Sequence, residues 1–335
     1  MKKILSVLFV LLLSISVFAA CAKEPEADGE AGATANVADT TIRLASLKGP
    51  TTMGLVKLIS DSEQGLTEYK VESTMYGTAD EVSGLLINGD VDIAAIPANL
   101  ASVLYNKTNG AIQVAAINTL GVLYIAENGS SVSSVADLKG KTIYSTGKGT
   151  TPEYVLNSLL RWHNIDPEND LTIEYKSEAT EIAALLASTD QEIIAVLPQP
   201  YVTSVIAQNE GVRIALDITE EWQAASGKTL VTGVAVVRTE FAQNNPEAVA
   251  AFLADYKTSA EWINANAADA SVLIEKYEIV AKAALAEKAL PFCNITYIDG
   301  AGMQQAIAAY LEVLFEQNPE SVGGSLPDEG FYYKS

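Results

Sequence analysis

Two short loops carry the residues of this sequence that are best suited to hold a ligand. Each loop follows a short apolar run that ends in serine, and each combines lysine, glycine and two threonines. The two loops are Lys48-Gly49-Pro50-Thr51-Thr52 and Lys148-Gly149-Thr150-Thr151. A helix-like segment follows each loop, so the N–H groups of the helix start face the space beyond the strand. We expect the two loops to face each other across one bound molecule.

The two lysines have a functional and a simpler interpretation. As ligand-binding residues, Lys48 and Lys148 would hold an anionic or electron-rich group with help from the helix N-termini. As turn residues, they would simply be exposed to solvent. The Gly147-x-Gly149 spacing is not a nucleotide-binding loop, because a third glycine and the Gly-Lys-Ser/Thr ending are both missing.

The residues needed for common catalytic and metal sites are scarce. The sequence has one histidine, His163, and two cysteines, Cys21 and Cys293. This leaves no Ser–His–Asp or Cys–His constellation beside a nucleophile motif and makes a zinc site improbable. We therefore predict no catalytic residue, no metal site, no cofactor and no enzymatic activity. We expect His163 at a solvated helix end and Cys293 as a buried free thiol, with the cleft rim as the alternative place for Cys293.

The charge balance excludes one class of partner. The 335 residues include 21 Lys and Arg against 42 Asp and Glu, which gives a formal net charge of −21. Nucleic-acid binding requires a positive surface, so nucleic acid is excluded as a partner. The chain is long enough for two lobes, each with a core of its own.

The elements that must position the two loops are themselves repeated. Residues 77–86 and 177–186 both read as helices with acidic residues in the first turn. Residues 91–97 and 192–198 both read as buried strands that end at proline, and helices follow at 99–105 and 201–208. Alternating strands and helices predict an α/β fold with parallel sheets covered by helices.

Ligands of such sheets lie beyond the carboxyl ends of the strands. The residues at these ends and at the breaks between the lobes are our candidate ligand-binding residues: Lys48, Gly49, Pro50, Thr51, Thr52, Gly77, Thr78, Pro97, Asn99, Asn118, Thr119, Lys148, Gly149, Thr150, Thr151, Tyr154, Gln199, Tyr201 and Thr232. The threonines are equally suited to cap helices. Tyr154 and Tyr201 either stack on a planar ligand or pack in a lobe core.

Two long β-type runs separate the repeats from each other and from the C-terminal part. Residues 114–124 have a polar break at Asn118-Thr119, and residues 230–237 have one at Thr232-Gly233. Two such crossings suit a two-strand hinge, although plain core strands with one bulge each also explain them. Asp217 and Trp222 follow another β-type run, where they either meet a cationic or aromatic ligand or lie in a surface loop.

The N-terminal residues read as an export signal. Residues 1–20 combine two lysines, an apolar stretch and small residues before Cys21. Ala19-Ala20-Cys21 resembles the bacterial lipoprotein box, which implies cleavage before Cys21 and lipidation of its thiol. Residues 21–40 are rich in Ala, Gly and acidic residues, so we expect them to form a flexible tether. An uncleaved anchor helix is the alternative.

The C-terminal third is predicted to be helical. Apolar residues recur at three-to-four spacing within 247–264, 269–277, 280–290 and 299–318. We expect these helices to pack on the first lobe. The tail at 323–333 reads as an ordered strap held by its aromatic residues.

Several segments resemble one family of transport proteins. The segments that carry the resemblance are Asp92-Ile93-Ala94-Ala95-Ile96-Pro97, residues 116–124, Val135-Ala136-Asp137-Leu138-Lys139-Gly140-Lys141-Thr142-Ile143 and Asn244-Asn245-Pro246-Glu247-Ala248-Val249. The sequence from Thr40 onward is similar to the solute-binding lipoproteins of ABC importers, in the nitrate/sulfonate/taurine and thiamine-precursor (NMT1-like) group. The lipidation signal before Cys21 and the internal repeat are also typical of these lipoproteins. The resemblance implies a type II periplasmic-binding-protein fold. Lobe I would comprise 41–118 and 234–335, and lobe II would comprise 119–233.

The resemblance also implies a role and its partners. The expected protein is a monomer on the outer face of the bacterial cytoplasmic membrane, held there by its lipid anchor. It would capture a small solute and deliver it to an ABC permease and its ATPase. Thiamine or its pyrimidine precursor is one candidate solute, because the proposed walls lack an arginine to clamp an oxyanion. An alkanesulfonate, taurine or nitrate is the alternative.

Two other functions are alternatives to solute binding. The group includes pyrimidine synthases, which depend on a cysteine-rich iron site that this chain lacks. A sensory or adhesive surface protein is a third possibility.

Overall fold

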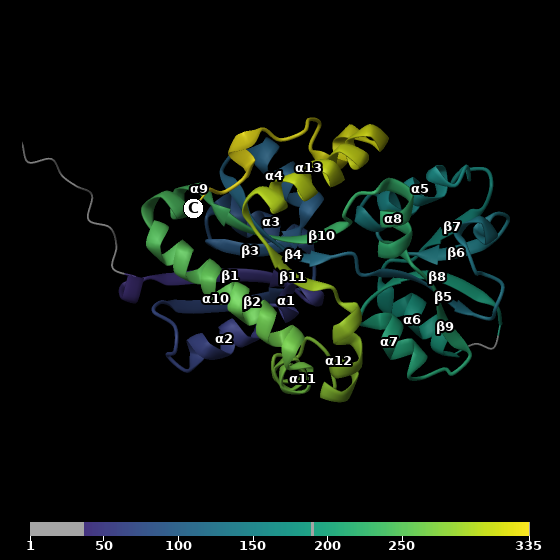
Figure 1. The fold of residues 1–335 in the computed structure, drawn as a ribbon, viewed down its shortest axis with the longest axis horizontal. Coiled ribbons are helices and arrows are strands. Elements are labelled where there is room, and N and C mark those ends of the chain that lie inside the picture. Colours follow the sequence, from purple (N-terminus) through teal and green to yellow (C-terminus); the bar gives the residue numbers. More distant parts are fainter. Residues whose placement is uncertain (1–36, 189–190, 335) are drawn as a thin grey trace, which may run out of the picture. The chain divides into compact units, whose positions relative to one another are not determined.

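The strands form two separate sheets. The computed structural model describes residues 37–188 and 191–334. The first sheet has the order β11-β4-β10-β3-β1-β2, and the second has the order β7-β6-β8-β5-β9 (Figure 1). The strands are β1 (Thr41–Leu47), β2 (Lys70–Tyr76), β3 (Ile93–Pro97), β4 (Ile112–Leu120), β5 (Leu123–Asn128), β6 (Thr142–Ser145), β7 (Thr172–Tyr175), β8 (Ile193–Pro198), β9 (Val212–Asp217), β10 (Val231–Arg238) and β11 (Ile295–Ile298). We call each sheet with its covering helices a lobe.

The predicted repeat is confirmed by the pairing of the strands. In the first lobe β1 lies between β2 and β3, and both pairings are parallel. In the second lobe β6 lies between β7 and β8 in the same parallel manner. An antiparallel strand then flanks each set, β10 beside β3 and β5 beside β8. The two halves therefore repeat the same topology, and the carboxyl ends of their parallel strands carry the two loops.

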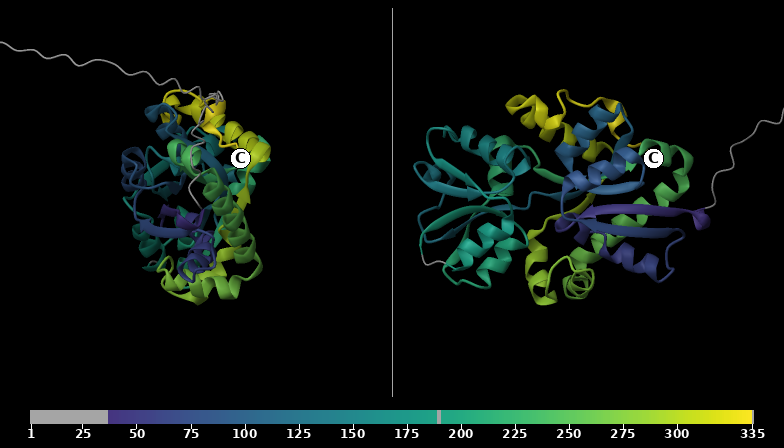
Figure 2. Two further views of the ribbon diagram at one scale, coloured as in Figure 1. Left: turned by 90° about the vertical axis from the view of Figure 1, so that its left-hand side faces the viewer. Right: turned by 180° about the vertical axis from the view of Figure 1, so that it is seen from behind.

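Helices cover both sheets, as the views in Figures 1 and 2 show. They are α1 (Pro50–Met53), α2 (Val56–Glu63), α3 (Ala79–Asn88), α4 (Ala98–Thr108), α5 (Thr151–Trp162), α6 (Ala179–Ser188), α7 (Tyr201–Ile206), α8 (Ile218–Ser226), α9 (Thr239–Asn244), α10 (Pro246–Ala265), α11 (Ala267–Lys276), α12 (Ala283–Ala289) and α13 (Gly300–Gln317). The C-terminal helices lie within a few residues of the predicted ranges, because each buries an apolar stripe at helical spacing. Within 37–188 and 191–334, no helix is both long and apolar enough to cross a membrane.

The chain crosses between the sheets twice, as predicted, once between β4 and β5 and once between α8 and β10, but the polar breaks do not lie at these crossings. Asn118 and Thr119 lie inside β4, where they are 1% and 0% exposed, and Gly233 lies inside β10 at an irregularity in its register with β4. The first crossing is instead the two residues between β4 and β5. The Asn294 side chain donates to the Gly121 carbonyl at 2.6 Å, and Leu120 N donates to the Asn294 carbonyl at 3.1 Å. The polar breaks in the sequence mark irregularities within the sheet, and a loop from the C-terminal part fixes the crossing itself.

An aromatic cluster corrects the interpretation of Trp222. This side chain is fully buried, and its ring lies 4.7 Å from that of Trp162 on α5 and 6.0 Å from that of Tyr310 on α13. Neither a surface loop nor a ligand contact describes it, so both alternatives were wrong. The sequence showed a tryptophan after a strand but not the two helices, distant in the chain, that enclose it.

The tail forms the predicted aromatic strap. Phe331 and Tyr332 are buried, Tyr332 pairs with Val114 at the side of β4, and the Phe331 ring packs edge-on against Tyr105 at 5.2 Å. The predicted export signal, lipidation site and most of the tether lie outside the described residues. The last tether residues form a short 3-10 turn at Val37–Asp39.

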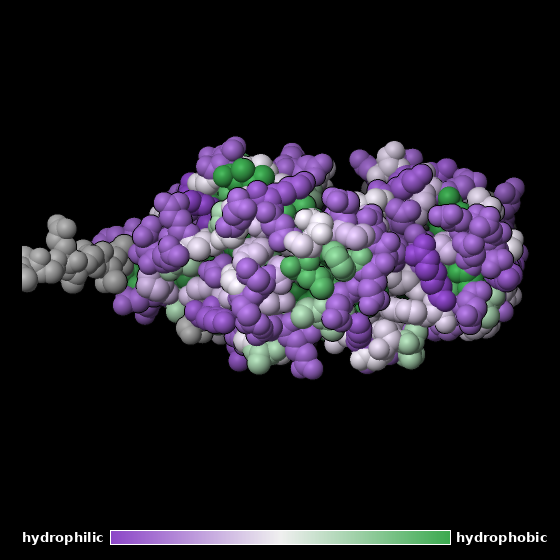
Figure 3. Space-filling model, turned by 90° about the horizontal axis from the view of Figure 1, so that it is seen from above, coloured by the Kyte–Doolittle hydropathy of each residue, from purple (hydrophilic) through white to green (hydrophobic). Residues whose placement is uncertain are grey.

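The surface is mostly hydrophilic. Figure 3 shows hydrophobic areas only as small, separate patches on the face seen from above. The large hydrophobic side chains that are exposed are scattered over the chain: Leu66, Ile87, Val272, Phe292 and Leu326.

Candidate solute-binding cleft

A cavity of about 600 Å³ lies where the strand ends of the two lobes meet. Its size falls in the range of small-molecule sites in proteins. Residues from both lobes line it, including predicted candidates from each half: Pro97, Asn99, Gly149, Thr150, Thr151, Tyr154 and Thr232. The second loop therefore reaches this cavity, which we call the larger cavity.

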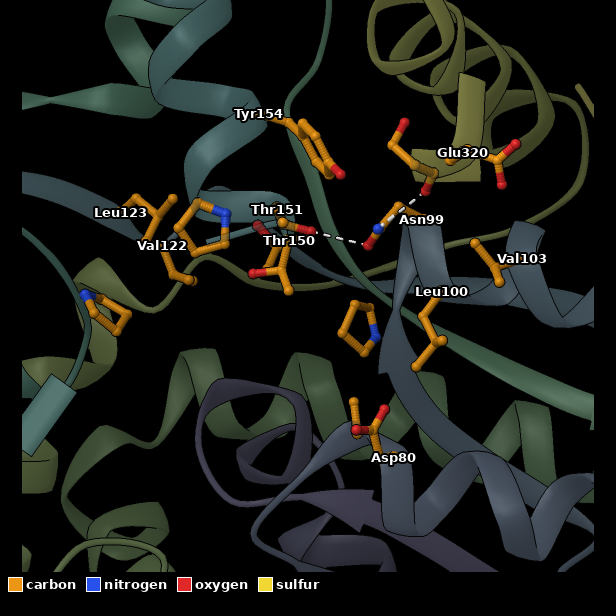
Figure 4. Close-up of a pocket in the computed structure, with 17 residues that line it drawn as sticks. Asp80, Asn99, Leu100, Val103, Val122, Leu123, Thr150, Thr151, Tyr154 and Glu320 are labelled. Atoms are coloured by element: carbon orange, nitrogen blue, oxygen red, sulfur yellow. Dashed lines mark hydrogen bonds between the residues drawn. The ribbon is translucent and has the colours of Figure 1, made fainter. Parts of the chain in front are cut away.

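The two lobes are hydrogen-bonded to each other at the larger cavity. Thr151 at the start of α5 donates its hydroxyl to the Asn99 side-chain oxygen at 2.9 Å. The Asn99 amide in turn donates to the Ser321 carbonyl at 3.2 Å. Figure 4 shows the bond between Thr151 and Asn99. Asn99 thus ties α4, α5 and the C-terminal segment together.

Tyr154 is held in place as part of the cavity wall. It is 8% exposed, and its carbonyl accepts a hydrogen bond from Gln317 at 2.9 Å. The Asn318 amide approaches its hydroxyl at 3.3 Å. Because both ends of this residue are held and its ring packs in the hydrophobic core, contact with a planar ligand would cost little further side-chain entropy.

The charges at the larger cavity are negative. Asp80 and Glu320 line it, and no lysine, arginine or histidine does so among the described residues. Most other lining residues are apolar: Ala79, Leu100, Val103, Val122, Leu123, Pro152 and Pro198. In Figure 4, Asp80 and Glu320 lie on different sides of the cavity. An anion would find no lysine, arginine or histidine in this lining, whereas a neutral or cationic group would need none.

A smaller cavity of about 340 Å³ contains the first loop. Lys48, Gly49 and Pro50 line it together with Gln199 and Tyr201. Val122 and Pro198 line both cavities, so the two cavities lie on either side of these residues. The two predicted loops consequently contribute to neighbouring cavities and not to the walls of a single one.

The remaining candidates have other roles in the described structure. The Thr51 hydroxyl donates to the Leu47 carbonyl at 3.0 Å, and the Thr52 hydroxyl donates to the same carbonyl. Thr78 caps α3 together with Glu81. Lys148 lies over the Tyr175 ring, 5.8 Å from its centroid. The candidates that line neither cavity are Thr51, Thr52, Gly77, Thr78, Asn118, Thr119 and Lys148.

Several lining residues were missed by the sequence analysis. Asp80 stands two residues after a candidate, so its place in the first turn of α3 was a usable signal. Glu320 and Ser321, and Ile279, Val280, Ala281 and Leu285 in the smaller cavity, come from the C-terminal third. No local sequence pattern predicts these C-terminal lining residues, because only tertiary packing brings the C-terminal third to the cleft.

Cys293 and His163 lie where the sequence predicts, the first as a buried thiol and the second at an exposed helix end. Cys293 is fully buried, and burial raises the pKa of its thiol to about 12. A thiol with so high a pKa is unreactive at neutral pH. His163 is exposed at the end of α5. Among the described residues, no group of three His, Cys, Asp or Glu side chains is placed to hold a metal ion.

A sequence comparison identifies the family. A model of the NMT1/THI5-like family matches residues 63–270, more than half of the chain. The chain belongs to the NMT1/THI5-like family. The matched residues include the second lobe and the strand ends β3 and β8 that face the larger cavity. No curated protein matches the sequence.

Solved structures share the fold of this NMT1/THI5-like protein. An ABC transporter from Parabacteroides distasonis is 23% identical, with 88% of this chain and 99% of that chain covered and a TM-score of 0.74. The periplasmic aliphatic sulphonate binding protein SsuA from Escherichia coli is 17% identical, with 88% and 92% covered and a TM-score of 0.69. The nitrate-binding protein NrtA from Synechocystis PCC 6803 is 14% identical, with 72% and 66% covered and a TM-score of 0.53. The predicted type II periplasmic-binding-protein fold is confirmed.

Proposed function

We propose that the protein is the extracytoplasmic solute-binding component of an ABC importer. It captures a small organic solute between its lobes and presents it to a permease driven by an ATPase. The family and the fold support this role, since similar structures are described as an ABC transporter, a sulphonate-binding and a nitrate-binding protein. The observation that carries the proposal is the larger cavity, which residues of both lobes line and the Thr151–Asn99 bond borders.

The ligand class follows from the lining of the larger cavity. Asp80, Glu320 and the fixed Tyr154 ring favour a neutral or cationic molecule with a planar part. Thiamine and its pyrimidine precursor have this character and are our first candidates. A sulfonate, taurine or nitrate would need a cation that this cavity does not offer. A micromolar ligand requires only about −8 kcal/mol, which stacking and a few hydrogen bonds can supply.

A role in transport explains the site better than catalysis. Pyrimidine synthesis would need a cysteine cluster, and the sequence holds only Cys21 and Cys293. The proposed placement is the outer face of the cytoplasmic membrane, with lipidated Cys21 as the anchor and a monomeric protein beyond it. Mass spectrometry of the membrane fraction tests this part: a diacylglycerol-modified N-terminal Cys21 is expected, and an intact residue 1–20 segment would contradict it.

Binding measurements test the solute class. We expect thiamine or its pyrimidine precursor to raise the melting temperature, and a ligand at 100 times its Kd stabilises a protein by about 2.7 kcal/mol. Nitrate and simple alkanesulfonates should have no effect. For a cationic ligand, Asp80→Asn and Glu320→Gln should each weaken binding about tenfold, because each removes an attractive charge.

The matched control is Glu210→Gln, which removes an exposed carboxylate that lines neither cavity. It should leave the affinity unchanged. Binding of nitrate or sulfonates in preference to the heterocycles would reject the ligand class, and loss of affinity in the Glu210 variant would show a general charge effect.

A further inference from the structure

The two neighbouring cavities carry opposite charge. Asp80 and Glu320 line the larger cavity, whereas Lys48 is the one charged side chain among the described residues that line the smaller. The Lys48 side chain is exposed, and no ion pair or hydrogen bond occupies its ammonium group within residues 37–188 and 191–334. Its counterpart Lys148 lies instead over the Tyr175 ring. Of the two loop lysines, only Lys48 lines one of these two cavities.

A buried amide donor lines the same smaller cavity. Gln199 is 1% exposed, and its side-chain oxygen accepts from the Thr203 hydroxyl at 2.8 Å and from Thr203 N at 3.4 Å. These bonds fix which end of the amide is the donor. The Nε2 atom is buried without a hydrogen-bond partner in the described structure. A buried donor without a partner is costly, by about 1–3 kcal/mol, so an acceptor supplied by a ligand would relieve that cost.

The two cavities share part of their lining. Val122 and Pro198 line both, so a ligand that passes these two residues has one end in each cavity. An end in the larger cavity meets the Tyr154 ring and two carboxylates. An end in the smaller cavity meets the Lys48 ammonium and the Gln199 donor. The charge separation along the cleft matches a molecule with a cationic or donor-bearing ring at one end and an anionic group at the other.

We infer that the ligand is amphoteric: a cationic or donor-bearing planar ring in the larger cavity, joined to an anionic tail that Lys48 and Gln199 bind in the smaller cavity. This inference rests on the proposed solute-binding function and narrows its substrate class. It also explains why the strongly acidic chain keeps an unpaired lysine in the cleft. A phosphate or carboxylate tail would accept hydrogen bonds from both residues, and charge-assisted bonds of this kind are the stronger ones.

The test compares ligands that differ only in the tail. Calorimetric titration gives Kd for thiamine and thiamine monophosphate, and for an aminopyrimidine methanol and its phosphate ester. The tail gain is the Kd of the plain molecule divided by that of its phosphate. We expect a tail gain of about tenfold or more in the wild-type protein, measured at low salt where charge contributions are largest.

Variants assign the gain to the smaller cavity. Lys48→Met should reduce the tail gain to about one, and Gln199→Leu should reduce it in part. Lys148→Met is the matched control and should retain the full gain. Unchanged melting temperatures verify that each variant is folded.

The outcomes separate this inference from the function on which it rests. If the plain molecules bind and the wild-type tail gain is one or less, the amphoteric ligand is rejected and the solute-binding role stands. A full gain in Lys48→Met would also reject it. If no member of either pair binds, the heterocyclic ligand class of the proposed function fails and this inference fails with it.

Discussion

The two lysine-bearing loops are alike in sequence and different in what they do. The first loop, 48–52, leads into the four-residue helix α1, and its two threonines hydrogen-bond back to Leu47 within the same lobe. The second loop, 148–151, leads into the twelve-residue α5, and Thr151 bonds across to Asn99 in the other lobe. The first loop offers its lysine to a cavity, whereas the second keeps its lysine over Tyr175.

This difference teaches that a repeated motif preserves a position in the fold more faithfully than a chemical role. Both loops follow the central strand of their parallel set, so topology fixes where they lie. The length of the helix that follows, and the neighbours supplied by the rest of the chain, decide which atoms reach the ligand. Four substitutions test this contrast between the position of a loop and the contacts that it makes.

The largest effect should come from the core under α5. Trp222→Ala removes a fully buried ring that packs against Trp162 of α5 and Tyr310 of α13. We expect a loss of about 3–5 kcal/mol in the free energy of unfolding, typical of a large aromatic removed from a core. Urea unfolding measures it. A loss below about 1 kcal/mol would show that α5 does not depend on this cluster, and the second loop would then lack the support we assign to it.

The turn just before the second loop should tolerate a backbone change poorly. Gly147 has a φ of 71°, and a Cβ there would lie 2.5 Å from the Thr150 hydroxyl and 2.9 Å from the Pro152 ring. Gly147→Ala combines left-handed strain with a clash, so we expect a cost of about 2 kcal/mol or more.

Gly149→Ala is the matched control for this substitution. Gly149 has a similar φ of 77°, but nothing lies within 4 Å of the added Cβ. Strain alone should cost about 1 kcal/mol. Thermal unfolding of the two variants compares them, and equal losses would show that the tight packing of the second loop contributes nothing.

A buried carboxylate of the second lobe gives a pH prediction. Glu127 is fully buried in β5; its oxygens accept from Ser131 N, the Ser131 hydroxyl, Val132 N and Arg213. Burial alone would raise its pKa, but these donors together hold the pKa below the usual 4.5. A lowered carboxylate pKa stabilises the fold above the unfolded pKa, and the contribution disappears as the pH falls through the folded pKa.

The effect of Glu127→Gln on the free energy of unfolding should therefore depend on pH. We expect a destabilisation of about 1–2 kcal/mol at pH 7, because the charged acceptor is lost. The difference from the wild-type protein should shrink below pH 4.5. Chemical unfolding at pH 7, 5 and 3.5 measures this, and a difference that stays constant with pH would contradict the assigned charge.

The sequence predicted most of the fold because the relevant signals are local. Strands ending at Pro97 and Pro198, helix caps such as Thr78 and the apolar stripes of α10 and α13 are all readable within a few residues of chain. The candidate loops followed from the same rule of strand ends. The sequence did not predict which side chains of the C-terminal third line each cavity. Glu320 lines the larger cavity and residues 279–281 line the smaller one, and all of them are more than a hundred residues from either loop in the chain. The burial of Trp222 and the crossing fixed by Asn294 likewise depend on long-range packing, which no spacing in the sequence encodes.

The smallest effect should come from the hydroxyls of the two loops themselves. Thr151→Val removes one of the hydrogen bonds between the lobes, and Thr51→Val removes one within the first lobe. A hydrogen bond is worth about 0.5–1.5 kcal/mol, so Thr151→Val should lower the ratio of this arrangement to a more open one by about two- to tenfold. Thr51→Val should leave that ratio unchanged, because both of its partners move together. Single-molecule energy transfer between dyes on exposed Glu178 and Lys257, replaced by cysteine in a chain with Cys21→Ser, reports the ratio directly. Equal shifts in both variants would mean that the second loop does not connect the lobes, and the contrast between the loops would then reduce to the placement of Lys48.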